Sequence, residues 1–250
     1  MTEAGQRTAL VTGASTGIGY AIACRLAREG YDLAVTGRNP TSFEPLLRDP
    51  AIQGRKIVPL RLDLRVESDI VQAFAAAVAA FGAIDVLVNN AGRALPKLAS
   101  EVTWVDWDDV LAINLKGAYF LTRQFAGHCI ERGRPGSVVN IASTHGLAGF
   151  PGRSVYGISK GGLVQMCRML AIEWAPHNIR VNAVAPATVM TESRQHQLDD
   201  ATRTKLLARI PSGRFVTPEQ VAATVCFLAG PEAESITGQT LPVDGGLTAT

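Results

Sequence analysis

The stretch Ala9–Gly19, ALVTGASTGIG, places three glycines between an apolar run and a segment with helical spacing. Because Gly13, Gly17 and Gly19 have no side chain, bare backbone there can approach a ligand, and N–H groups at the helix start can point at an anion. The pattern predicts a turn that binds the pyrophosphate of a dinucleotide. Its spacing, GxxxGxG, matches the general GxGxxG fingerprint loosely, and a tight turn without a ligand would also use such glycines.

Strand-like and helix-like segments alternate from this turn almost to the C-terminus. After ALVTG, the expected strands are DLAVTG (32–37), KIVPLRL (56–62), IDVLVNN (84–90), GSVVNIAS (136–143), IRVNAVAP (179–186) and TLPVDGG (240–246). Short apolar runs of this kind are typical of parallel strands that are covered on both faces. An eight-unit barrel would need one more strand. The sequence therefore predicts one α/β domain over residues 1–250, a Rossmann-type doubly wound parallel sheet of about seven strands with helices on both faces.

The helices between these strands show apolar residues at three- and four-residue spacing. They are expected near 68–81, within 104–132 and within 153–175. Near the C-terminus, Thr217 is a predicted N-cap, Pro218 a first-turn proline and Gln220 a capping-box partner. Gly230 is positioned to end that helix.

The composition indicates a folded protein without a strongly charged surface. Of the 250 residues, 47% are hydrophobic and 18% are charged, and the formal net charge is +2, so we expect no nucleic-acid partner. The polar start MTEAGQR leads straight into a strand-like run, and no apolar run reaches the ~20 residues that cross a bilayer. We therefore expect a cytoplasmic protein with no membrane partner. The four cysteines lack CxxC spacing, which favours buried free thiols and no metal site: Cys24, Cys129, Cys167 and Cys226.

The end of the second expected strand indicates which cofactor is bound. NAD-binding sheets of this type often have an acidic side chain there for the adenosine 2′-hydroxyl, but this chain has Thr36, Gly37, Arg38 and Asn39. The permanently charged guanidinium of Arg38 suits a 2′-phosphate, so NADP(H) is favoured and NAD(H) remains possible. Arg38 could instead be a solvated loop residue, and the neutral Thr16 weakens the case for NADP(H).

The segment RSVYGISKGGL, residues 153–163, places Tyr156 and Lys160 one helical turn apart on the same face. Three glycines in this segment each cost a helix roughly 1 kcal/mol relative to alanine: Gly157, Gly161 and Gly162. We expect that this helix lies close to the cofactor and to another helix, because close approach would compensate for the lost propensity.

Taken together, the motifs resemble those of the short-chain dehydrogenase/reductase family. They are TGASTGIG (12–19), NNAG (89–92), Asn114 in AINLKG, Ser143 in VNIAS and YGISK (156–160). YxxxK alone is not specific, but the order and spacing of the five motifs are, and the resemblance covers nearly the whole chain. Members similar in general appearance are 3-oxoacyl-carrier-protein reductases and sugar or polyol dehydrogenases. The resemblance implies hydride transfer between a nicotinamide and a ketone or secondary alcohol.

The resemblance also implies four catalytic residues. Tyr156 would be the acid/base, and Lys160 would lower its pKa and bind the ribose of the cofactor. Ser143 would orient the reacting oxygen, and Asn114 would hold a water that passes protons to Lys160. Taken singly, each residue also has a purely structural interpretation.

For the cofactor, the resemblance implies a larger set of residues. Val189 by its backbone and Thr191 by its hydroxyl would hold the carboxamide, and Asp63 would lie near the adenine. The chain has Ala187 where the family usually has glycine, and alanine would be strained there if the position requires positive φ. The full predicted set is Gly13, Ser15, Thr16, Gly17, Ile18, Gly19, Arg38, Asp63, Leu64, Asn90, Ala91, Gly92, Tyr156, Lys160, Pro186, Val189 and Thr191.

Other functions remain open at this stage. A catalytically inactive NADP(H)-binding sensor with the same fold is the main alternative, although the complete catalytic set argues against it. A methyltransferase on a related sheet would need neither the Tyr/Lys turn nor Arg38. Because relatives usually pair the glycine-containing helix across a subunit interface, we expect a homotetramer or a homodimer.

The segment 190–215 corresponds to a mobile substrate lid in relatives. Its basic residues either contact an anionic substrate or form a solvated face: Arg194, His196, Arg203 and Arg209. His145 and Phe150 are expected at the mouth of the pocket, where neither identifies the substrate.

Overall fold

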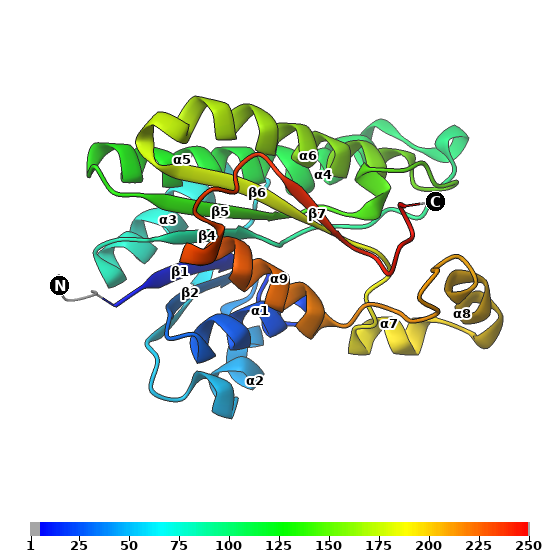
Figure 1. Ribbon diagram of the computed structural model, residues 1–250, viewed down its shortest axis with the longest axis horizontal. Coiled ribbons are helices and arrows are strands. Elements are labelled where there is room, and N and C mark those ends of the chain that lie inside the picture. The colour runs from blue at the N-terminus through cyan, green and yellow to red at the C-terminus, as the bar shows by residue number, and fades with distance from the viewer. Residues whose placement is uncertain (1–5, 250) are drawn as a thin grey trace.

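The computed structural model describes residues 6–249 and contains one seven-stranded parallel sheet (Figure 1). Its order is β3-β2-β1-β4-β5-β6-β7, so the direction of winding reverses between β1 and β4. Crevices at such switch points bind ligands in open α/β sheets. The strands are β1 (Thr8–Thr12), β2 (Asp32–Gly37), β3 (Ile57–Arg61), β4 (Val86–Asn89), β5 (Gly136–Ile141), β6 (Ile179–Pro186) and β7 (Thr240–Val243).

Helices cover both faces of the sheet. Helices α1, α2 and α9 lie on one face and α3 to α6 on the other, while α7 and α8 lie beyond the carboxyl ends of the strands (Figure 1). The helices are α1 (Gly17–Arg28), α2 (Glu44–Leu47), α3 (Glu67–Phe81), α4 (Trp104–Leu111), α5 (Ala118–Glu131), α6 (Ser154–Trp174), α7 (Glu192–Gln197), α8 (Asp200–Leu207) and α9 (Pro218–Ala229). The doubly wound architecture predicted from the sequence is confirmed.

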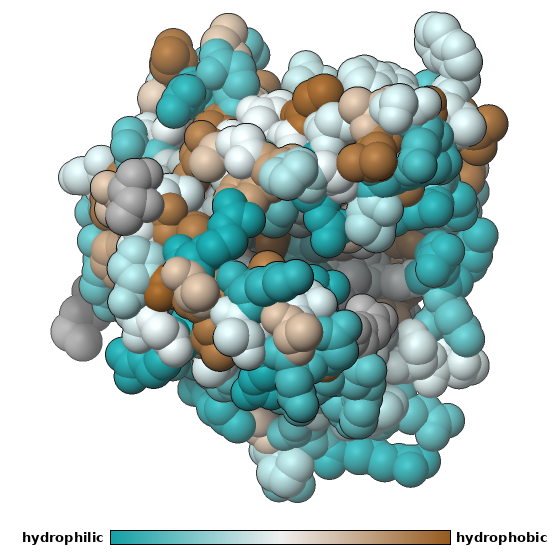
Figure 2. All heavy atoms as spheres, turned by 90° about the vertical axis from the view of Figure 1, so that its right-hand side faces the viewer, coloured by the Kyte–Doolittle hydropathy of each residue, from teal (hydrophilic) through white to brown (hydrophobic). Residues whose placement is uncertain are grey.

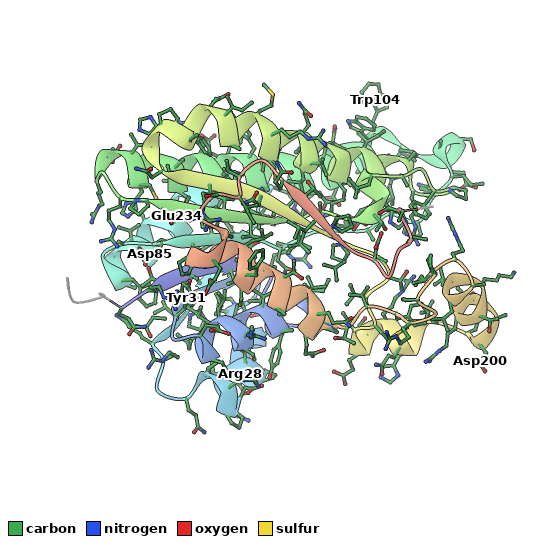
Figure 3. All side chains as sticks on the ribbon, in the orientation of Figure 1. Arg28, Tyr31, Asp85, Trp104, Asp200 and Glu234 are labelled. Carbon is green, nitrogen blue, oxygen red and sulfur yellow. The ribbon has the colours of Figure 1, made fainter. Side chains whose placement is uncertain are left out.

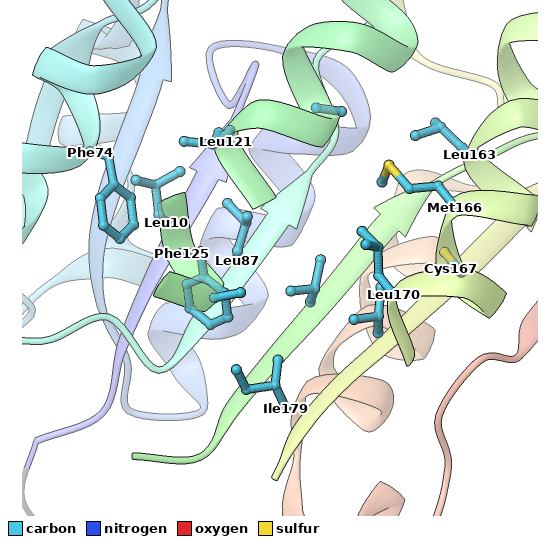
Figure 4. Close-up of a cluster of buried hydrophobic side chains, with 14 of the residues drawn as sticks. Leu10, Phe74, Leu87, Leu121, Phe125, Leu163, Met166, Cys167, Leu170 and Ile179 are labelled. Carbon is cyan, nitrogen blue, oxygen red and sulfur yellow. The ribbon is translucent and has the colours of Figure 1, made fainter. Parts of the chain in front are cut away.

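Alternate residues of the central strands point into two separate cores. In β1, Leu10 belongs to the core under α3, α5 and α6, which Figure 4 shows with Leu87 and Phe125. Its neighbours Ala9 and Val11 belong to the opposite core, under α1 and α9. All five residues of β1 and all six of β5 are buried, which explains why these strands appear as continuous apolar runs in the sequence.

The predicted caps of α9 are present. The Thr217 hydroxyl accepts from the Gln220 amide, the Gln220 side chain accepts from the Thr217 amide, and Pro218 is the first helical residue. The expected helical segment 104–132 is not one regular helix. A π-helical turn, Ala112–Gly117, separates α4 from α5. Residues 190–215 contain the short helices α7 and α8, which the sequence analysis did not resolve individually.

The glycines of α6 fit the expectation of close approach at two of three positions. A Cβ on Gly157 would lie 2.9 Å from the His145 carbonyl oxygen, and one on Gly162 would lie 2.6 Å from Leu115 Cδ2 in the π-helical turn. At Gly161 the nearest atom would be 3.6 Å away, which is ordinary contact. The helix therefore packs closely against the 3₁₀ turn Thr144–Gly146 and against the π-helical turn.

The four cysteines are free thiols, three of them buried and Cys226 partly buried, as the sequence analysis expected. Within residues 6–249, no helix has the length and apolar character needed to span a membrane.

We predict that Gly157→Ala destabilises the protein by about 1–2 kcal/mol, because the added methyl meets a backbone oxygen that cannot rotate away. Gly127→Ala in α5 is the matched control. No atom lies within 4 Å of its added Cβ, so it should be neutral or stabilise by up to about 1 kcal/mol. Urea unfolding followed by circular dichroism measures both. Equal effects of the two substitutions would contradict close packing at Gly157.

Candidate active site

The face at the carboxyl ends of the strands is hollowed, and hydrophilic side chains surround the hollow (Figure 2). Two cavities lie there, of about 610 and 520 Å³. They share Thr16, Asn90, Gly92 and Arg93, so they form one continuous cleft across the switch point. Every residue of the predicted cofactor set lines one cavity or the other. The first cavity contains Arg38 and Asp63, and the second contains Tyr156 and Lys160.

The glycine turn has the backbone geometry of a phosphate-binding loop. Gly13 and Gly17 have positive φ (65° and 59°), which favours glycine. A Cβ on Gly19 would lie 2.2 Å from the Gly13 carbonyl oxygen, so no larger residue fits there. No side chain caps α1 at Thr16, and its first N–H groups remain available to an anion. These observations fit a dinucleotide better than a turn without a ligand.

The NNAG turn holds the glycine turn in place. The Asn90 side-chain amide donates to the carbonyl oxygens of Thr12 (2.8 Å) and Gly13 (3.0 Å). The Thr12 hydroxyl in turn accepts from the backbone amides of Asn90 and Ala91. Asn89 donates to Asn140 on the next strand, as expected for a residue that stabilises the central sheet. The two motifs are therefore one hydrogen-bonded unit.

The first cavity, predicted to hold the adenosine of a cofactor, contains several charged side chains. Asp63 forms an ion pair with Arg65 (2.6 Å), and this contact lowers the pKa of Asp63 to about 2. Arg65 is further bound by Asp109. Arg38, by contrast, has no ion pair within the described residues. The hydroxyl of Thr36, which also lines this cavity, is buried without a hydrogen-bond partner among the same residues.

The loop after β6, predicted to hold the nicotinamide, lines the second cavity. Ala187 does not have positive φ, since Asn178 is the only non-glycine residue within 6–249 that does, so the alanine is not strained. Val189 forms a parallel bridge with Val216. The Thr191 hydroxyl accepts a bond from the Arg194 amide and caps α7, which leaves its own proton free for a ligand.

Tyr156, Lys160 and Ser143 meet where β5 ends. The Lys160 ammonium is buried and donates to the Ile141 carbonyl oxygen (2.7 Å), and its nitrogen lies 5.8 Å from the centre of the Tyr156 ring. Burial lowers the pKa of Lys160 to about 8. Burial also raises the pKa of Tyr156, and a hydrogen bond with Ser143 opposes this in part. The charge of Arg153 also lowers the Tyr156 pKa, whereas the lowering expected from Lys160 is not among the causes of the shift.

Asn114 lies in the π-helical turn and lines neither cavity. Its side chain binds both backbone groups of Arg93 (2.7 and 2.9 Å) and donates to the Ser159 hydroxyl (3.0 Å). A Cβ on Gly92 would lie 3.3 Å from Asn114 Oδ1 and 3.4 Å from Lys160 Nζ. The side chains of Asn114 and Lys160 therefore approach the same point on the backbone from two sides.

His145 contacts two of the predicted catalytic residues, Ser143 and Tyr156, more closely than its expected place at the pocket mouth implied. Its Nδ1 lies 3.1 Å from the Ser143 hydroxyl, and its ring centre lies 5.6 Å from that of Tyr156. Burial and the charges of Arg153 and Arg209 lower its pKa to about 4, so the ring is neutral at pH 7. In the sequence, the only indication of this contact is that His145 follows Ser143 by two residues.

Comparisons with known proteins identify the family of the chain. A family model described as enoyl-(acyl carrier protein) reductase matches residues 13–248. 2-Dehydro-3-deoxy-D-gluconate 5-dehydrogenase from Escherichia coli (strain K12) is 37% identical over 244 residues, covering 97% of this chain and 96% of that protein. The chain belongs to the short-chain dehydrogenase/reductase family.

Two solved structures of the short-chain dehydrogenase/reductase fold are similar over nearly their full length. A candidate 2-deoxy-D-gluconate 3-dehydrogenase from Agrobacterium tumefaciens with bound NADP has a TM-score of 0.89 at 36% identity and covers 98% of this chain and 97% of its own. A 3-ketoacyl-(acyl-carrier-protein) reductase from Brucella melitensis complexed with NADH has a TM-score of 0.87 at 33% identity. The match covers 97% of this chain and 98% of the reductase chain.

Membership in the family makes the protein an NAD(P)-dependent oxidoreductase that acts on CH–OH and C=O groups. Over the part of the chain that the structure describes, no cluster of His, Cys, Asp or Glu side chains could hold a metal ion.

We predict that the His145 imidazole titrates with a pKa of about 4, because both burial and two arginines disfavour its charged form. In the unfolded chain the same ring would bind a proton near pH 6.5, so this residue lowers stability as the pH falls from about 6.5 towards 4. Proton NMR, with assignment by His145→Gln, measures the pKa. Arg153→Gln should raise it. A value near 6.5 in the folded protein would contradict the buried, electropositive environment.

Proposed function

We propose that the protein is an NADP(H)-preferring oxidoreductase that interconverts a ketone and a secondary alcohol, with Tyr156 as the acid/base. The main support is that Ser143, Tyr156 and Lys160 line the same cavity as the glycine turn. An inactive NADP(H)-binding sensor would have no need for two adjacent desolvated titratable groups at this place. No observation favours the sensor.

The proposed chemistry depends on where these side chains hold protons. A nicotinamide cofactor supplies or accepts the hydride. Tyr156 donates the phenolic proton to the oxygen that becomes the alcohol, or takes it back in the reverse direction. Ser143 orients and stabilises that oxygen by a hydrogen bond. The contact with His145 Nδ1 helps to fix the direction of the Ser143 hydroxyl.

Lys160 is proposed to position the cofactor and to relay protons. Its ammonium has three donors, and the Ile141 carbonyl oxygen accepts one, so two remain for the hydroxyls of a ribose. Because its pKa is about 8, it can release a proton close to neutral pH. Asn114 Oδ1, on the other side of Gly92, is well placed to hold a water between them. We propose this water as the route for protons to bulk solvent.

The proposed preference for NADP(H) depends on Arg38. Its guanidinium lines the adenosine cavity without a carboxylate partner among the described residues, whereas Arg65 is bound by Asp63 and Asp109. One similar structure contains NADP and another NADH, so the family alone does not decide between them. Residues 190–215 are proposed as the substrate lid.

A homotetramer or homodimer is proposed from apolar side chains on the outer surface of α4 and α6. Trp104 is 83% exposed and points away from the body of the protein (Figure 3). On α6, Ile158, Met169 and Ile172 are exposed at spacings that place them on one side of the helix. Exposed apolar groups of this size commonly mark subunit contacts.

We predict that Tyr156→Phe lowers kcat by about 10²–10⁴-fold, because general acid–base catalysis contributes that much. Binding of NADPH should persist, since the phenyl ring keeps the shape of the pocket. Stopped-flow turnover and the fluorescence enhancement of bound NADPH measure the two effects separately. Retention of a tenth or more of the activity would remove Tyr156 from the proposed role.

We predict that Arg38→Ala lowers kcat/KM for NADPH by about tenfold or more and leaves kcat/KM for NADH within twofold, because the lost contact is to the 2′-phosphate. Arg65→Ala is the matched control, since Arg65 is already held by two carboxylates. Steady-state kinetics with NADPH and with NADH measure kcat/KM for both variants. An unchanged ratio of the two constants in Arg38→Ala would show that another group selects the cofactor.

We predict that the protein at micromolar concentration has a mass of two or four chains by light scattering. Ile172→Lys should reduce that mass, because a charge on the exposed α6 surface opposes close packing of apolar side chains. Lys205→Glu on the lid is a suitable surface control. A monomeric mass for the unaltered protein would contradict the proposal.

A further inference from the structure

Three arginines lie around the mouth of the catalytic pocket. Arg153 directly precedes α6, three residues before Tyr156, and is partly buried. Arg194 lines the same cavity as Tyr156. The Arg209 guanidinium lies 4.6 Å from the centre of the Phe150 ring, which lies 4.3 Å from the His145 ring.

The positive charges are close enough to repel one another. Arg194 contributes to lowering the pKa of Arg153, after the larger effect of burial. Arg153 and Arg209 together disfavour the protonation of His145. Arg194 and Arg209 were among the basic residues predicted for the lid, but Arg153 was not. Arg153 lies at the start of α6, outside the lid segment.

Among the side chains that the structure describes, no carboxylate pairs with any of these arginines, and none of their guanidinium groups donates a hydrogen bond to them. Another partly buried arginine gives a useful contrast. Arg180 donates to the carbonyl oxygens of Leu228 (2.7 Å) and Gly230 (3.2 Å) at the end of α9. Where a partly buried arginine has a structural role in this protein, as Arg180 does, backbone carbonyl oxygens accept its hydrogen bonds.

A partly buried cation without a counter-ion is costly, and a second cation nearby raises the cost. A solvated lid surface explains Arg203, which is exposed and lies over the Phe215 ring. It does not explain Arg153, which is partly buried and whose charge lowers the pKa of both His145 and Tyr156. A bound anion would supply the missing hydrogen-bond acceptors to both Arg153 and Arg194.

We propose that the substrate is a small ketone or alcohol with an anionic terminus such as a carboxylate, and that Arg153 and Arg194 bind this terminus while Arg209 lies at the rim. The proposal deepens the proposed oxidoreductase function and rests on it. The planar guanidinium groups suit bidentate contact with an oxyanion. Because Arg153 precedes α6 and Arg194 belongs to α7, the anion would also connect the lid to the catalytic helix.

The kinetic test uses pairs of ketones that differ only in charge: 3-oxobutanoate, 4-oxopentanoate and 5-oxohexanoate, each beside its methyl ester, with saturating NADPH. We expect at least one acid to exceed its ester at least tenfold in kcat/KM. The preferred chain length then reports the spacing between the carbonyl and the arginines. Equal values for acid and ester across all three pairs would overturn the proposal.

Variants assign the effect to particular residues. Arg153→Gln and Arg194→Gln should each raise KM for the preferred acid about tenfold or more and leave KM for its ester and for NADPH within twofold. Arg153→Lys should restore part of the loss, and Arg203→Gln is the control that changes neither. If KM for NADPH rises instead, these arginines bind the cofactor and the proposal is wrong. Selective loss on a larger acyl-carrier substrate, with none on the acids, would also overturn it.

A binding measurement separates this proposal from the proposed function. Pentanoate, which has no carbonyl to reduce, is titrated into the protein with NADP⁺ while the His145 signal is followed by NMR. We expect a saturable change in the His145 signal at pH 7, where pentanoate is ionised, and loss of that change in Arg153→Gln. This result would support the anion site even if no ketone is reduced. Absence of any effect of pentanoate up to 100 mM would overturn the site even if neutral ketones are reduced.

Discussion

The hydrogen bond from the buried Lys160 ammonium to the Ile141 carbonyl oxygen is the contact on which the rest of the site depends. A buried ammonium group needs hydrogen-bond acceptors, and one acceptor here is the carbonyl oxygen of Ile141, the last residue of the central strand β5. The bond fixes α6 relative to the carboxyl end of β5. Since Ser143 follows β5 by two residues and Tyr156 lies one turn before Lys160, the same contact fixes the distance between them.

Close backbone approach is what makes this arrangement possible. A Cβ on Gly146 would lie 2.7 Å from the carbonyl carbon of Lys160, and one on Gly157 would meet the His145 oxygen. Gly92 has Asn114 and Lys160 on two sides. The helix propensity lost at Gly157 is thus offset by contacts that hold the catalytic groups together. This explains why glycines occur inside a helix of 21 residues.

Much of this could be predicted from sequence because it depends on local patterns. The strands were visible as apolar runs, and the cofactor cleft followed from glycine spacing at the switch point. The π-helical turn at Ala112–Gly117 was not predicted, because such turns are rare and short and have no residue signature comparable to a cap or a proline. Arg153 was not recognised as part of the pocket, because its neighbours come from the lid and from the turn after β5. The net effect on Tyr156 was also missed, since desolvation depends on packing that spacing does not reveal.

The distribution of paired and unpaired arginines connects the two ends of the cleft. Arg65, which lines the cavity of Arg38, and Arg93, which lines both cavities, each pair with Asp109. Arg38 at the adenosine end and Arg153 at the substrate end have no such partner among the described residues. If the proposed ligands bind here, their charges complete the electrostatics of the cleft, and charge on the ligand becomes a condition for tight binding.

The pKa shifts of Tyr156 and His145 determine which protonation states the site holds near neutral pH. Burial raises the pKa of Tyr156, so the phenol keeps its proton at neutral pH and is ready to donate it. A neutral His145 beside Ser143 adds no charge that would release that proton. Oxidation of an alcohol would require the phenolate, which the charge of Arg153 stabilises in part. In the proposed mechanism, the protonated Tyr156 present near neutral pH is the form that donates to a carbonyl, and the phenolate needed for alcohol oxidation becomes more populated as the pH rises.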